Sequence, residues 1–203
     1  MTIIIIIITS LFSIIAFLNK ALFERFQFNP YQTLYNREWY RIVTHGFLHA
    51  NWTHLIINML VLLSFGSAIE SSFRLMAIHT WLKLPMLCYL AFYLTSIIIS
   101  SLITLRKHRN DYWYNSVGAS GAVAAVLFCC IFFEPKMTLY FMGILPVKAF
   151  IFGPLYILYS WYSARKAKDN INHDAHLWGA VFGFCFPILI DPKMIQLFIE
   201  KLF

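Results

Sequence analysis

The stretch NSVGASGAVAAV, residues 115–126, joins a polar segment to a long apolar one. Gly118 and Gly121 flank a serine, Ser120, where the apolar segment begins. A helix that starts there leaves its first backbone N–H groups unpaired, and its dipole favours negative charge at that end. The two glycines also let another backbone approach Ser120 closely. This combination suits a nucleophile beside an oxyanion site, and it equally suits close packing between membrane helices.

The composition indicates that lipid is the main solvent of this chain. Of its 203 residues, 60% are hydrophobic and 12% are charged, whereas a soluble domain is about half apolar and about a quarter charged. The net charge of +7 is spread in short clusters, which favours the headgroups of a lipid bilayer over nucleic acid as a partner. The four cysteines lie within apolar segments and are predicted to be small buried hydrophobes.

Apolar segments that approach the length of a membrane-spanning helix, about 20 residues, recur along the chain. The first lacks the positive start and the small-residue cleavage site of a signal peptide, so we expect it to be retained. Residues 19–49, rich in aromatic and cationic side chains, are expected to lie at the headgroup level. The sequence therefore predicts an all-α membrane protein, a six-transmembrane-helix bundle forming one domain over residues 1–203, with spans at residues 2–18, 50–69, 84–105, 117–133, 146–161 and 173–190.

Polar side chains collect near the start of the second, fourth and sixth predicted spans, at His54, Asn58, Ser120 and His176. Successive spans alternate in direction, so these three starts lie on the same side of the membrane. Polar groups at membrane depth are costly, and they suggest function by default. Three separate segments that place such groups at one depth therefore predict a common site.

The last predicted span begins HDAHLWGAVFG, residues 173–183, which places His176, Gly179 and Gly183 on one helix face. If the fourth span packs against this face, Ser120 and His176 approach within the roughly 2.6–3.2 Å that proton transfer requires. The alternative is a packing helix with a hydrogen-bonded histidine. Asp174 projects from another side and is expected to cap the helix.

The second predicted span places His54 and Asn58 four residues apart, and so on one face. Both side chains can donate hydrogen bonds, and with the Ser120 amide they would complete an oxyanion site. The alternative is polar contact between helices without any catalytic role.

Taken together, these motifs resemble those of the rhomboid family of intramembrane serine proteases, over about residues 38–183. Their residues are, in chain order, Tyr40, Arg41, Thr44 and His45 of the first loop, His49, His54 and Asn58 of an H…HxxxN pattern, Gly118, Ala119, Ser120 and Gly121 of a GxSG motif, and Ala175, His176, Gly179 and Gly183 of an AHxxGxxxG motif. Each motif is weak by itself, and their order along the chain makes the resemblance specific.

The resemblance implies that Ser120 is the nucleophile and that His176 is the general base and acid. It also implies that His54, Asn58 and the Ser120 amide hold the oxyanion, with supporting roles for Gly118, Gly121, Gly179, Gly183 and Arg41. No metal or other cofactor is implied. The implied substrates are other membrane proteins, cut near the outer end of a transmembrane helix, and the compact chain suggests a bacterial plasma membrane by analogy.

The chain departs from the family pattern in two respects. Rhomboids often carry a large aromatic residue beneath the histidine, four positions after the serine, where this chain has Ala124. We therefore expect Trp178 or a neighbouring aromatic residue to orient His176. Ten of the sixteen Lys and Arg residues lie on the side assigned to the site, which by the positive-inside rule would be cytoplasmic, whereas the family places this side outside. We follow the family.

Two other functions were weighed against a protease. The spacings His45-x-x-x-His49 and His173-x-x-His176 faintly resemble the histidine boxes of membrane metal enzymes, but paired His-His boxes and the HExxH motif are absent from the sequence. A catalytically inactive rhomboid-like protein that binds membrane helices is the other alternative, although such a protein need not keep both Ser120 and His176.

Overall fold

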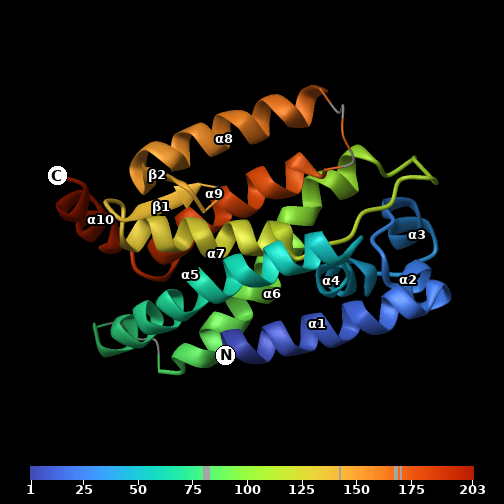
Figure 1. The fold of residues 1–203 in the computed structure, drawn as a ribbon, viewed down its shortest axis with the longest axis horizontal. Coiled ribbons are helices and arrows are strands. Elements are labelled where there is room, and N and C mark those ends of the chain that lie inside the picture. The colour runs from blue at the N-terminus through green and yellow to red at the C-terminus, as the bar shows by residue number, and fades with distance from the viewer. Residues whose placement is uncertain (80–82, 142, 167–168, 170) are drawn as a thin grey trace.

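The chain forms a bundle of helices in a computed structural model, which describes residues 1–79, 83–141, 143–166, 169 and 171–203. Three positions of the basic connection at 165–172, namely 167, 168 and 170, lie outside these ranges. The long helices are α1 (Thr2–Leu18), α5 (Trp52–His79), α6 (Pro85–Lys107), α7 (Ser120–Phe133), α8 (Ala149–Lys166) and α9 (His173–Ile190). In Figure 1, α7 and α9 lie in the middle of the bundle, with α1 and α8 at opposite edges.

Shorter elements fill the connections. Before α5 lie α2 (Lys20–Phe26), α3 (Pro30–Tyr35), α4 (Arg41–Thr44) and a 3-10 turn (His45–Phe47), within the segment predicted to lie at the headgroups. An antiparallel hairpin of β1 (Thr138–Phe141) and β2 (Leu145–Lys148) joins α7 to α8, and α10 (Met194–Leu202) follows α9.

The predicted spans agree with the helices at some boundaries and differ at others. Residues 2–18 and 173–190 coincide with α1 and α9. Helix α5 continues past its expected end at residue 69 to His79, because neither Gly nor Pro interrupts residues 70–79. Helix α7 starts at Ser120 rather than at residue 117, because Gly118 has a φ of +129°. Helix α8 starts at Ala149 rather than at residue 146, because β2 takes up the preceding residues.

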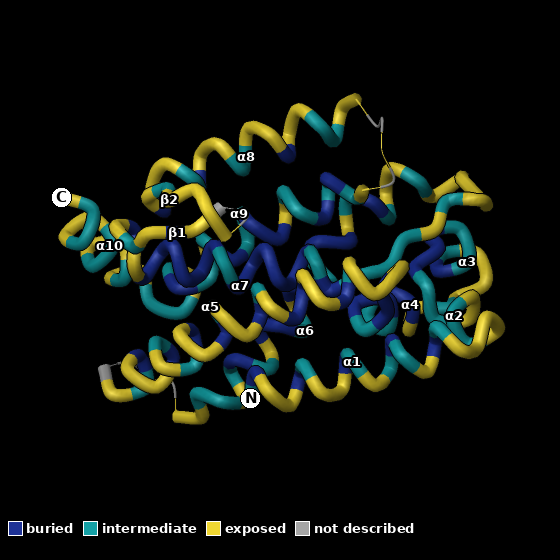
Figure 2. Tube along the Cα trace, in the orientation of Figure 1, coloured by how far each residue is buried: buried dark blue, intermediate teal, exposed yellow. Residues whose placement is uncertain are grey.

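Three of these helices are long and apolar enough to cross a membrane by themselves, namely Trp52–Ile78, Pro85–Lys107 and His173–Ile190, while α1 and α7 are shorter apolar helices. The 14 residues of α7 rise about 21 Å, against a hydrocarbon layer of about 30 Å. All of them except Ser120 and Leu127 are buried, as Figure 2 shows by the dark tube. Because α7 is shorter than the helices around it, its first residue lies within the thickness of membrane that those helices cross.

Helix α1 shows how the chain divides protein contact from lipid contact. Its buried residues are Thr2, Ile5, Thr9, Ser13 and Ala16, which recur at helical spacing on one face. Several other isoleucines, such as Ile3 and Ile7, are about half exposed. The protein-facing side of α1 is therefore made mainly of small and weakly polar side chains, and its outward side of large apolar ones, as in other membrane helices.

The cysteines correct one prediction from the sequence. Cys129 and Cys130 are buried and Cys88 is partly buried, but Cys185 is exposed on α9, and all four are free. An apolar membrane helix has an outward face as well as an inward one, so an apolar neighbourhood in sequence does not establish burial.

Candidate active site

Ser120 and His176 meet at the starts of α7 and α9. The Oγ atom of Ser120 lies 2.8 Å from Nε2 of His176, which is within hydrogen-bonding distance. Both residues are partly buried rather than sealed in the core. A proton can therefore pass between them at a place that a third molecule can reach.

Two glycines of α9 produce this approach. A Cβ atom at Gly179 would collide with the backbone of Gly121, and one at Gly183 would collide with the backbone of Ala125. The backbones of α7 and α9 thus touch directly at two successive levels. Because Gly121 follows Ser120 and Gly179 lies one turn after His176, this contact fixes the serine and the histidine side by side.

His54 lies against the loop that leads into α7. A Cβ atom at Gly118 would lie 2.6 Å from Cε1 and 2.9 Å from Nε2 of His54, so the imidazole occupies the space that a side chain would need. Asn58, predicted to share the oxyanion site, is 6% exposed and donates from its amide to the His54 carbonyl oxygen at 2.8 Å. The His54 ring thus lies beside Gly118, which precedes Ser120 by two residues in the chain. Asn58 lies one helical turn further along α5.

The loop at residues 19–49 also bonds to the turn that precedes Ser120. The Gly118 amide donates to the carbonyl oxygen of His45 at 3.0 Å. Nδ1 of His45 lies 2.9 Å from the Arg41 carbonyl oxygen, and its Nε2 lies 3.2 Å from Oγ of Ser101 on α6. Burial lowers the pKa of His45 to about 4, so this histidine is neutral at pH 7. It therefore tethers the turn before Ser120 to α6.

His49 and Ser13 form a second tether, which the sequence analysis did not assign. The Ser13 hydroxyl donates to the Phe47 carbonyl oxygen at 2.8 Å, and Nδ1 of His49 lies 3.0 Å from the same hydroxyl. Nε2 of His49 then accepts from the Ala119 amide at 3.5 Å. Burial, together with the charge of His54, lowers the pKa of His49 to about 3. The sequence signals were the H…HxxxN pattern that includes His49 and a serine within an isoleucine-rich segment, and neither indicated that the two residues meet.

Arg41 lies in the loop and acts at a distance from the dyad. Its guanidinium pairs with Glu38 at 2.5 Å and donates to the carbonyl oxygens of Glu24 and Gln27 at 2.8 Å each. These contacts close α2 onto α4, and the side chain is buried. The Arg41 side chain therefore shapes the loop that carries His45.

The start of α9 differs from its prediction. Asn172, not Asp174, caps the helix, because its side chain accepts from the Ala175 amide at 3.0 Å and from the Thr104 hydroxyl at 3.0 Å. The carboxylate of Asp174 pairs instead with Lys107 at 2.9 Å. Both contacts fasten the start of α9 to the end of α6, beside His176.

The aromatic neighbour of His176 also differs from the first residue expected. Trp178 is 39% exposed, and no ring contact joins it to His176 in the described part of the chain. Ala124 is buried in a small cluster with Phe128 and Ala180. The ring that meets His176 belongs to His173, with centroids 6.0 Å apart.

Several histidine side chains bond to other groups of the protein, and the histidines do not gather into a set of metal ligands among the described residues. Among the residues that the structure describes, no three His, Cys, Asp or Glu side chains come together to hold a metal ion. His45 and His49 contact backbone and hydroxyl groups, while His173 and His176 contact a carboxylate and a hydroxyl.

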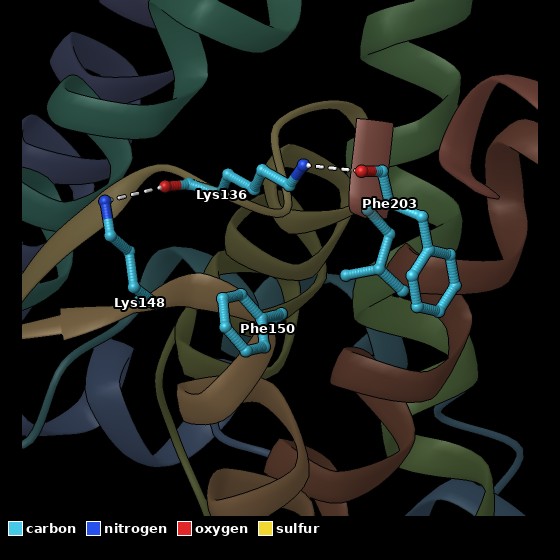
Figure 3. Close-up of a pocket in the computed structure, with 5 residues that line it drawn as sticks. Lys136, Lys148, Phe150 and Phe203 are labelled. Atoms are coloured by element: carbon cyan, nitrogen blue, oxygen red, sulfur yellow. Dashed lines mark hydrogen bonds between the residues drawn. The ribbon is translucent and has the colours of Figure 1, made fainter. Parts of the chain in front are cut away.

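A separate hollow of about 560 Å³ lies near the other end of α7 (Figure 3). Lys136 donates to the Phe203 carbonyl oxygen at 3.3 Å, and Lys148 donates to the Lys136 carbonyl oxygen at 3.2 Å. Lys136 thus joins the turn before β1 to the residue that follows α10, while Lys148 joins β2 back to that turn. The hollow is remote from Ser120 by the length of α7, about 20 Å.

The fold and site define a class: a helical membrane protein with a serine–histidine pair at a glycine-lined helix crossing. Residues 36–192 match the rhomboid domain family, which is more than half of the chain. The protein therefore belongs to the rhomboid family and is a multi-pass membrane protein.

Similar proteins occur in bacteria and in plant organelles. The chain is 28% identical over 169 residues to the putative rhomboid protease YdcA of Bacillus subtilis, covering 78% of this chain and 70% of YdcA. It is 29% identical over 154 residues to the mitochondrial RHOMBOID-like protein 12 of Arabidopsis thaliana, covering 68% of this chain and 43% of that protein. It is 32% identical over 162 residues to the chloroplastic rhomboid-like protein 11 of the same plant, covering 71% of this chain and 50% of that protein.

Proposed function

We propose that this protein is an intramembrane serine endopeptidase that cleaves transmembrane segments of other membrane proteins. The observation that carries the proposal is the 2.8 Å separation of Ser120 Oγ and His176 Nε2. A hydroxyl becomes a useful nucleophile when an adjacent base can take its proton. Family membership and the glycine-lined crossing support the same assignment.

The proposed reaction follows from the positions of these groups. Ser120 Oγ attacks the scissile carbonyl carbon while its proton passes to His176 Nε2. The resulting oxyanion accepts from the Ser120 amide, which has no backbone partner among the described residues, and from the side chains of His54 and Asn58. His176 then gives its proton to the leaving amine. Water, activated by the same imidazole, hydrolyses the acyl-enzyme and restores Ser120.

The substrate class follows from backbone physics. A peptide bond within a lipid-buried helix is hydrogen-bonded and shielded, so the helix must unwind before attack. Gly, Ser and Pro weaken a helix or leave room at the bond. We therefore expect cleavage near Gly, Ala, Ser or Pro in the outer part of a substrate helix. We further propose a bacterial plasma membrane as the location, with the dyad on its outer side.

Cleavage of single-span reporter proteins in liposomes tests the proposal. The wild-type protein should cut a reporter with Gly or Pro in its span, and Ser120→Ala and His176→Ala should each abolish the cut. Ser64→Ala is a matched control, because Ser64 is exposed on α5 and, among the described residues, its hydroxyl bonds only to the carbonyl oxygen of Leu60. Reporter binding without cleavage would contradict the proposal and favour a helix-binding role, and inhibition by chelators would favour a metal enzyme.

The oxyanion assignment has its own test. Asn58→Ala and His54→Ala should each lower kcat by roughly 10- to 1000-fold with little change in KM, because single oxyanion donors act mainly in the transition state. Unchanged kcat in both variants would remove these two side chains from the site.

A further inference from the structure

His173 is the one side chain besides Ser120 whose ring or polar contact with His176 is recorded among the described residues. The two imidazoles meet edge to face, with centroids 6.0 Å apart and planes inclined at 82°. Both are on the first turn of α9, three residues apart, and so on adjacent positions of one face. Ser120 contacts one part of the His176 ring, and His173 contacts another.

His173 is itself fixed from two directions. Its side chain is 3% exposed, and its Nε2 lies 3.1 Å from each carboxylate oxygen of Asp169. The ring of Tyr159 on α8 meets it edge to face, with centroids 5.6 Å apart at 86°. A ring held by a carboxylate on one side and an aromatic ring on another has little freedom to turn.

The choice of histidine at this position is informative. Nδ1 of His173 is buried with no hydrogen-bond partner among the described residues, and an unpaired buried polar atom is unfavourable by about 1–3 kcal/mol. Phenylalanine would fill the same space without that penalty, but it would give up the bond to Asp169. The bond to Asp169 is therefore the property that distinguishes histidine from a simple aromatic filler.

Neither the position where rhomboids often carry an aromatic residue nor the tryptophan expected in its place supplies this contact. Ala124 has no ring, and it is buried with Phe128 and Ala180. Trp178 lies two residues from His176 on an outward part of the helix and is 39% exposed. Of the two side chains that meet the His176 ring, Ser120 is the proposed reacting group, so His173 is the one available to orient the ring.

We propose that His173, anchored by Asp169 and Tyr159, is a positioning residue that holds the His176 imidazole in register with the Ser120 hydroxyl. The inference rests on the proposed protease function. A misplacement of about 1 Å in a reacting group lowers rates by about 100-fold, and a free imidazole can turn by more than that. His173 thus supplies, from the same helix, the support that Ala124 does not.

The experiment compares four variants, three in α9 and one at Asp169. The measured quantities are the rate at which a fluorophosphonate labels Ser120 and the kcat and KM for cleavage of a liposome reporter. His173→Ala should lower the labelling rate and kcat by about 30- to 100-fold with KM unchanged. His173→Phe keeps a ring but loses the Asp169 bond, so it should recover activity to within about 10-fold of wild type. Trp178→Ala, the matched control, should remain within twofold. Asp169→Asn, which still offers an oxygen acceptor, should lose no more than about fivefold.

A second readout separates this inference from the protease assignment. In ¹⁵N spectra of histidine-labelled protein, His176 should give one resolved pair of ring signals in wild type and in His173→Phe, and averaged signals in His173→Ala, even if the protein cleaves nothing. Identical His176 signals in wild type and His173→Ala would overturn the inference, as would a His173→Ala labelling rate equal to that of Trp178→Ala. Absence of wild-type labelling with the predicted spectra would instead defeat the protease function alone.

Discussion

Two helix contacts in this protein are built in opposite ways. Where α7 meets α9, Gly121 and Gly179 bring the backbones themselves into contact. Where α1 meets α5, large apolar side chains leave a hollow of about 390 Å³, lined by residues such as Ile6, Trp52 and Met59. The contact between α7 and α9 fixes the distance between Ser120 and His176. The hollow between α1 and α5 only has to be filled by apolar groups.

The difference predicts where the chain should tolerate substitution. A backbone-to-backbone contact has no side chain that can yield, so any added atom moves a whole helix. A contact through flexible side chains at the edge of a hollow can repack, and lipid can occupy what remains. The predictions below test this contrast, from the largest expected effect to the smallest.

Substitution at the crossing should have the largest effect. Gly179→Leu places a side chain in the backbone of Gly121, and we expect activity to fall more than 100-fold because Ser120 and His176 separate. Ser10→Leu adds a side chain of the same kind to the hollow between α1 and α5 and should keep activity within about twofold. Reporter cleavage measures the activity of both purified variants, and far-UV circular dichroism checks that they are folded. Equal activity of the two variants would contradict the contrast between the two helix contacts.

The turn before Ser120 should be the next most sensitive place. Gly118→Ala introduces a Cβ at a φ of +129° and directly against His54, so we expect a 10- to 100-fold loss of kcat. Gly143→Ala is the matched control, because Gly143 also has a positive φ, of +75°, but no described residue other than its chain neighbours lies within 4 Å of the added carbon. Steady-state cleavage kinetics separate strain alone from the clash, and a similar loss in both would assign the effect to strain.

Acid should weaken the tethers that tie the first loop and α1 to the site. The folded state depresses the pKa of His45 to about 4 and of His49 to about 3, so the unfolded chain takes up protons first as the pH falls. The stabilisation is therefore present above about pH 6.5 and is lost progressively toward pH 4.

The thermal unfolding midpoint in detergent, measured from pH 7.5 to pH 4, checks this pH window. His49→Gln removes one titrating group, so its midpoint should fall less steeply than that of wild type, although it starts lower by the loss of the Ser13 contact, about 1 kcal/mol. Parallel curves for the two proteins would show that His49 does not link stability to pH.

The ion pair between Lys107 and Asp174 should matter least. Its side chains are 45% and 17% exposed, and exposed pairs contribute about 0–1 kcal/mol. Lys107→Ala should therefore lower the free energy of unfolding by less than about 1 kcal/mol and leave kcat within about twofold. A large loss of activity would mean that this pair, rather than the glycine crossing, sets the position of α9.

Much of the site could be read from spacing alone. His176, Gly179 and Gly183 share a face by helical geometry, and Ser120 lies at the start of an apolar segment. Together they predicted a close contact between two helices far apart in the chain. The boundaries of α1 and α9 also followed directly from their polar flanks.

The features that escaped prediction depend on contacts between distant segments. The hairpin at residues 138–148 falls mainly between the fourth and fifth predicted spans and takes the first residues of the fifth, and the pairing of its two strands was not predicted. The cap by Asn172 rather than Asp174 depends on Thr104 of another helix as well as on local geometry. The tether from Ser13 through His49 to Ala119 crosses three segments, and nothing in any one of them indicates the others.

The most direct test of the account is the site and rate of fluorophosphonate attachment, followed by mass spectrometry of the purified protein in detergent. The account predicts that the adduct forms on Ser120, is absent in Ser120→Ala, and forms at least 100-fold more slowly in His176→Ala. An adduct on another residue, or a rate that His176→Ala leaves unchanged, would contradict the claim that this hydroxyl and this imidazole share a proton.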